Sequence, residues 1–225
     1  MDEKHFAKLR DTWTNTNVEQ RRILLANWRP KLSANDWVNY VFQGQLPSWA
    51  LDLPKDLPNR FEMEDHLKVE TDSSRAIAIV FSWGGMGVRN GRLFRENFES
   101  YANAVGSFTG SRKDSYDLLH RINANGVGPA FFTKLVRYLR PHASDTGYIM
   151  DQWLARSINL IYGRGILMHG QRRNYVHRDN NADVYELFSE RIERVAERLN
   201  CTSKEIEEFM FASTEWRNWV KGDHP

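Results

Sequence analysis

The most informative residues of this chain are two closely spaced glycines, Gly126 and Gly128, in a short turn between two segments with apolar stripes. Glycine permits positive φ angles and lets another backbone approach closely, as a tight turn between helices requires. The helix after the turn would present free N–H groups and the positive end of its dipole, which suits a phosphate oxygen. A plain corner between helices would show the same pattern, so both interpretations stay open. The candidate phosphate-binding residues are Ala124, Asn125, Gly126, Val127 and Gly128.

A second feature is Asp151, which follows the turn, a helical segment and a short apolar stretch. Together these motifs resemble those of the helix-hairpin-helix DNA glycosylases, most nearly the 8-oxoguanine DNA glycosylase-like branch. The resemblance covers residues 115–165, with a looser similarity at 81–87. It implies that the turn binds DNA and that Asp151 is the active-site aspartate. Taken alone, an aspartate before a helix is also a favoured N-cap.

The chemistry implied by this resemblance is cleavage of an N-glycosidic bond, which builds positive charge on the deoxyribose. A buried carboxylate at Asp151 would stabilise that charge and orient an attacking water or amine. Bifunctional members of the family carry a nucleophilic lysine two residues after the second hairpin glycine, where this chain has Ala130. Lys134 follows about one helical turn later, so we expect it on the same face and in reach of the same pocket. The alternative for Lys134 is a surface lysine or a phosphate contact.

A glycosylase must also turn its base out of the duplex, which requires stacking side chains and positive charge along the DNA backbone. Three aromatic residues near the motifs are the candidate base pocket, namely Trp83, Phe131 and Tyr148. Taken singly, each of them is more often a core residue than a pocket residue. Arg137, on the helix after the turn, is a further candidate for binding DNA phosphate.

The elements that must position these residues are mostly helices. Helical spacing of apolar residues predicts helices at 18–28, 92–105, 117–122, 129–140, 151–162, 183–199 and 203–211. The continuous apolar run at 76–81 fits either a buried strand or the inside of a helix, and we favour a helix. Three prolines predict a loop at 45–59. The fold class is therefore all-α, and the resemblance implies two lobes with the active site between them. We expect an N-terminal lobe at 1–110, the hairpin and aspartate region at 111–178, and C-terminal helices at 179–225.

The composition of this 225-residue chain excludes several classes of function. The single cysteine, Cys201, excludes an intrachain disulfide and four-cysteine zinc or iron–sulfur sites. None of the seven histidines forms a His-x-x-x-His pair, so we expect no metal and no cofactor. Residues 111–178 carry 11 Lys/Arg against four Asp/Glu, a balance that attracts polyanions. No run of 18 apolar residues occurs, and we expect a cytoplasmic monomer without membrane contact.

These inferences predict a DNA glycosylase that acts on double-stranded DNA containing a modified base. The resemblance suggests 8-oxoguanine as that base, and a competent Lys134 would add AP lyase activity. One alternative is an anti-phage defence glycosylase that excises a hypermodified base such as glucosylated hydroxymethylcytosine. Another is a noncatalytic helix-hairpin-helix module that only binds DNA.

Overall fold

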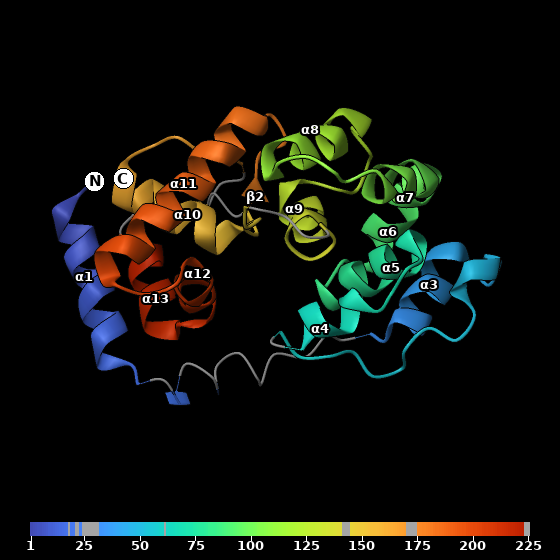
Figure 1. Cartoon of the computed structure of the whole chain (residues 1–225), viewed down its shortest axis with the longest axis horizontal. Helices are drawn as coiled ribbons and strands as arrows, with labels where there is room; N and C mark the ends of the chain where they lie inside the picture. The colour runs from blue at the N-terminus through green and yellow to red at the C-terminus, as the bar shows by residue number, and fades with distance from the viewer. Residues whose placement is uncertain are drawn as a thin grey trace. The chain divides into compact units, whose positions relative to one another are not determined.

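The computed structural model describes residues 1–17, 19–20, 23, 32–60, 62–140, 145–169 and 175–222. Within this part of the chain nearly all regular structure is helical, which confirms the all-α class (Figure 1). Most of the helix expected at 18–28 lies outside the described residues. The chain divides into two compact units, Trp28–Tyr148 and the combination of Met1–Asn27 with Ile149–Pro225.

The unit Trp28–Tyr148 is a helical cluster built around the α5 helix. Its elements are α3 (Ala34–Phe42), η1 (Ser48–Ala50), α4 (Met63–Lys68), α5 (Ser73–Trp83), α6 (Val88–Phe94), η2 (Arg95–Asn97), α7 (Phe98–Gly106), α8 (Arg112–Ile122) and α9 (Pro129–Tyr138). The α5 helix packs against α3, α7 and α9, and every side chain from Ala76 to Trp83 is buried. This burial on all sides explains why the 76–81 run shows no amphipathic pattern.

The helix expected at 92–105 is wrong as a single element, because the 3₁₀ turn η2 separates α6 from α7. Phe94 lies before this turn and Tyr101 after it, yet their rings meet edge to face at 4.8 Å. A 3₁₀ turn advances the chain by three residues per turn, close to the α-helical value. The apolar spacing therefore continues through the break and hides it from the sequence.

The unit that contains both chain ends is organised around the α10 helix. Its elements are α1 (Glu3–Asn15), α10 (Gln152–Tyr162), β1 (Met168–His169), β2 (Tyr175–Val176), α11 (Ala182–Leu199), α12 (Ser203–Ala212) and α13 (Thr214–Gly222). The α10 helix packs against α1, α11, α12 and α13. The two short strands pair antiparallel, with Met168 opposite Val176. The last helix, α13, was not expected from the sequence.

The boundaries of the compact units differ from the three expected ranges. The α7 and α8 helices pack together across residue 110, and α10 and α11 pack together across residue 178. The expected N-terminal lobe is divided as well, because α1 belongs with the C-terminal helices. Helix packing, which composition does not reveal, decides these boundaries.

Candidate functional site

The turn at 124–128 is shaped by one glycine in particular. Gly126 has a φ of +78°, and a Cβ atom there would lie 2.3 Å from the backbone oxygen of Asn90 in α6. Both facts require glycine, as the sequence predicts. Ala124 and Val127 are buried and anchor the turn, whereas Asn125 is exposed. The buried pair therefore supports the loop, and Asn125 and the glycine backbone form its accessible part.

The start of α9 presents backbone groups beside this turn. Gly128 is the N-cap residue in an extended conformation, with no side chain capping the helix, and Pro129 occupies the first helical position. A Cβ at Gly128 would meet no described heavy atom within 4 Å. An uncapped helix start of this kind carries partial positive charge and suits an anion.

Lys134 projects back along α9 towards its N-terminus. Its Nζ donates a hydrogen bond to the carbonyl oxygen of Ala130 and lies 5.0 Å from the centroid of the Phe131 ring. A Cβ at Gly84 would lie 2.7 Å from Cδ and 2.9 Å from Cε of Lys134. The absence of a side chain at Gly84 therefore makes room for the lysine stem, and the amine reaches the level of Ala130.

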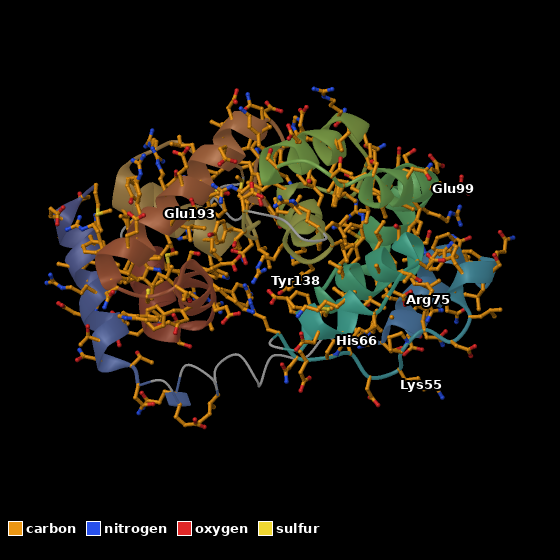
Figure 2. The ribbon with its side chains drawn as sticks, viewed as in Figure 1. Lys55, His66, Arg75, Glu99, Tyr138 and Glu193 are labelled. Atoms are coloured by element: carbon orange, nitrogen blue, oxygen red, sulfur yellow. The ribbon has the colours of Figure 1, made fainter. Side chains whose placement is uncertain are left out.

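The three aromatic candidates differ in exposure. Trp83 is 2% exposed and packs edge-on against Tyr138, which Figure 2 labels, with ring centroids 5.3 Å apart. Tyr148 is 1% exposed and lies beneath the guanidinium of Arg112 at 5.7 Å. Phe131 alone is partly exposed. Trp83 and Tyr148 therefore pack as core residues within their unit.

Arg137 has a protein partner. Its guanidinium forms an ion pair with Glu64 at 2.6 Å, and its side chain is only 9% exposed. An arginine held in this way has little of its surface left for a phosphate. In the basic stretch Arg112, Arg140 and Arg156 also have side chains that are largely covered by protein. The sequence count of positive charge therefore overstates what this stretch presents to solvent.

Asp151 is the N-cap of α10. Its Oδ1 accepts hydrogen bonds from the backbone N–H groups of Trp153 at 2.8 Å and Leu154 at 3.0 Å. The residue is 9% exposed, so its carboxylate is fixed and largely covered. The N-cap interpretation of the sequence is thus correct. Capping uses one carboxylate oxygen and is compatible with a second role for the group.

Hydrogen bonds hold two residues of the segment before Asp151, namely Asp145 and Ile149. Asp145 accepts hydrogen bonds from Arg140 and, at 2.9 Å, from the backbone N–H of Arg112. Burial by itself would raise the pKa of the Asp145 carboxyl, but Arg140 and Arg112 hold that pKa below its ordinary value. In the other unit the N–H of Ile149 donates to the buried Glu207 carboxylate at 2.7 Å. These bonds hold the chain on the approach to the aspartate.

Sequence reasoning missed a group of cations beside Asp151. Three cationic groups lie close to the centroid of the Trp153 ring. The distances are 4.2 Å for the Arg217 guanidinium, 5.2 Å for the Lys221 Nζ and 5.4 Å for the Arg156 guanidinium. Burial lowers the pKa of Arg217, and the negative charge of Asp151 acts in the opposite direction. The only sequence signal was the four-residue spacing of Arg217 and Lys221, which places both on one face of a helix.

The part of the chain that the structure describes contains neither a candidate metal site nor a candidate membrane-spanning helix. No group of three or more His, Cys, Asp or Glu side chains lies in a position to hold a metal ion. No helix there combines the length and the apolar character needed to cross a membrane.

The glycine turn, the open helix start and the capping aspartate are the features for which the sequence resembles DNA glycosylases. A family profile described as "Putative 8-oxoguanine DNA glycosylase OGG-like protein" matches residues 19–211. The match spans most of the chain, which therefore belongs to this OGG-like family. No curated protein and no solved structure gave a significant match. The family assignment agrees with the resemblance found in the sequence.

Proposed function

We propose that the protein is a DNA glycosylase that flips a modified base out of the duplex and cleaves its N-glycosidic bond. One observation carries the proposal: in a chain of the OGG-like family, Asp151 is buried and fixed by two backbone hydrogen bonds. In this proposal the turn at 124–128 and the start of α9 bind the DNA backbone through N–H groups.

Asp151 acts on the sugar as the bond breaks. The electrons of the N-glycosidic bond leave with the base, and positive charge develops on the deoxyribose ring. The carboxylate stabilises this charge because it is already oriented and largely shielded from water. Water that attacks C1′ loses a proton and leaves an abasic site, which is the monofunctional outcome.

Lys134 is the proposed nucleophile of a bifunctional reaction. Its amine donates a hydrogen bond to the backbone oxygen of Ala130, the residue at which the resemblance places the family's lysine. In the unprotonated form, the amine forms a bond to C1′ as the base leaves. Ring opening and loss of the nitrogen proton then give an imine, from which strand scission follows. The Nζ of Lys134 lies 5.0 Å from the centroid of the Phe131 ring, and the amine must lose its proton before it attacks the sugar.

The substrate we propose is 8-oxoguanine, on the basis of the family description. The chain departs from the family's usual lysine at Ala130, and because of this departure we keep a second candidate substrate, a hypermodified base such as glucosylated hydroxymethylcytosine in phage DNA, on which the same bond-breaking groups could act. In that case the enzyme would defend the cell against phage rather than repair its own DNA.

The proposal is tested on labelled duplexes containing 8-oxoguanine and, in parallel, on glucosylated phage DNA. Each sample is treated with alkali or with borohydride before electrophoresis. Scission only after alkali identifies the excised base and a monofunctional enzyme, whereas an adduct trapped by borohydride identifies a lysine nucleophile. Asp151→Asn is the matched control. Binding without cleavage of either substrate would indicate a noncatalytic DNA-binding module.

A further inference from the structure

The strongest feature outside the proposed mechanism is the cation group around Trp153. Arg217, Lys221 and Arg156 all lie within 5.4 Å of the centroid of its ring. Trp153 is two residues after Asp151 on the same chain segment, and its backbone N–H binds the Asp151 carboxylate. The cations therefore lie in the immediate surroundings of the proposed catalytic group.

The α13 helix holds two of these cations in fixed positions. Trp216 is fully buried, and its Nε1 donates a hydrogen bond to the Ser157 hydroxyl of α10 at 2.8 Å. The guanidinium of Arg156 donates to the backbone oxygen of Val220 at 3.2 Å. Because α13 is anchored at both of these points, Arg217 and Lys221 are directed towards Trp153 by the fold.

No carboxylate among the described residues forms an ion pair with Arg217 or Lys221. Within the described residues, neither side chain forms a hydrogen bond or an ion pair, and Arg217 is nonetheless half-buried. Among the carboxylates of the described residues, that of Asp151 is the one whose charge raises the pKa of Arg217, against the lowering by burial. A partly buried arginine without a carboxylate partner is unfavourable for folding alone, and it suits an anionic ligand.

We propose that Trp153, Arg217 and Lys221 form a second site for DNA phosphate, separate from the hairpin, beside the nucleotide whose base is removed. The inference rests on the proposed function, because Asp151 marks the position of that nucleotide. Arg217 donates paired N–H groups to the phosphate oxygens, and Lys221 adds a second charge. Trp153 keeps both side chains extended over its ring before DNA arrives.

The first test measures affinity for a fluorescent duplex that contains a tetrahydrofuran analogue of an abasic site. We expect Arg217→Gln and Lys221→Gln each to weaken binding about tenfold and to lower the salt slope by about one. Arg194→Gln is the matched control, because it removes one exposed charge from α11 in the same unit. Arg217→Lys keeps the charge and is expected to retain most of the salt slope while losing the paired hydrogen bonds. Lys221 is exposed, so its variant tests the site without disturbing the fold.

The second test locates the phosphate by replacing one DNA phosphate at a time with a neutral methylphosphonate. In the wild-type protein we expect a loss of affinity at each contacted phosphate. In Arg217→Gln that loss is expected to vanish at one position next to the abasic analogue, since the contact is already missing. Equal losses at every position in both proteins would overturn the inference.

The results also separate this inference from the proposed function. If the wild-type protein neither binds nor cleaves any duplex, both are overturned. If it binds and cleaves, but Arg217→Gln and Lys221→Gln behave like Arg194→Gln, the second phosphate site alone is overturned. If Arg217→Gln slows single-turnover cleavage with unchanged affinity and salt slope, Arg217 positions Asp151 instead, which likewise overturns the phosphate site.

Discussion

The hairpin region and the Asp151 region obtain their properties in different ways. In the hairpin most features are local: Gly126 permits the positive φ, and Gly128 and Pro129 start a helix without a side-chain cap. The Asn90 oxygen of α6 adds one distant contact at Gly126. Asp151 also has local partners in Trp153 and Leu154, but its further surroundings come from far along the chain and include Glu207 and Arg217. A short motif can therefore specify the backbone of the hairpin, whereas the surroundings of a buried carboxylate require the assembled tertiary structure.

The largest expected effect is at Asp151. Asp151→Asn should reduce base release at least about 100-fold, because the charge that stabilises the sugar cation is lost. Thermal stability should change little, since asparagine also caps helices well. Asp151→Ala should lose the same activity and, in addition, about 1 kcal/mol of stability. Single-turnover rates and thermal unfolding measure the two effects, and an active Asp151→Asn enzyme would refute the assignment.

The next largest effect is expected at Lys134, where a substitution should separate base release from formation of the covalent adduct. Lys134→Gln should abolish the adduct trapped by borohydride while base release falls by no more than about tenfold, because water replaces the amine as nucleophile. Lys113→Gln, in the same unit on α8, is the matched control and should still form the adduct. Persistence of the adduct in Lys134→Gln would place the nucleophile on another amine.

The two hairpin glycines should respond differently to the same substitution. Gly126→Ala should cost about 1–3 kcal/mol of stability, because of the positive φ and the contact with the Asn90 oxygen. Gly128→Ala should leave stability nearly unchanged and weaken DNA binding, since its surroundings are open towards the proposed phosphate. Chemical denaturation and fluorescence anisotropy give the comparison. Equal loss of stability in both variants would contradict it.

The smallest expected effect is pH-dependent and concerns Asp145. The pKa of its carboxyl in the folded protein is below the ordinary value of 3.8, so the ionised form adds stability at neutral pH. That contribution is lost as the pH falls through the folded-state pKa. Asp145→Asn should therefore lower stability by about 1 kcal/mol or less at pH 7 and make no difference in strong acid. A destabilisation that is the same at every pH would indicate a steric effect instead.

The sequence predicted those parts of the fold whose signals are local. Pro129 and the apolar stripe after it predicted α9, and the structure places that helix at Pro129–Tyr138. In contrast, α13 has only two buried residues, Trp216 and Val220, which is too short a pattern to recognise. The two-residue strands β1 and β2 carry even less signal.

The candidate site shows the same limit. The resemblance to the glycosylase family, together with spacing after the glycine turn, selected Asp151 and Lys134 as candidates, and their roles stay predictions. The space that Gly84 leaves for Lys134 depends on helix packing. The ion pair between Arg137 and Glu64 depends on helix packing as well. The partners in such contacts are distant in sequence. Residue type alone therefore does not show which arginine or lysine forms an ion pair with a carboxylate and which one is exposed to solvent.

The position of α1 among the C-terminal helices has a consequence for the order of events during synthesis. The N–H of Asp2 bonds to the backbone oxygen of Ile161 at 2.5 Å, and Lys8 pairs with Glu215 at 2.7 Å. These partners leave the ribosome long after α1, whereas α3 to α9 form one continuous stretch whose partners are already made. The unit that carries the hairpin can therefore fold first. The distant groups around Asp151 come into place last, so a nascent chain would complete its glycine hairpin before it completes the surroundings of the proposed catalytic carboxylate.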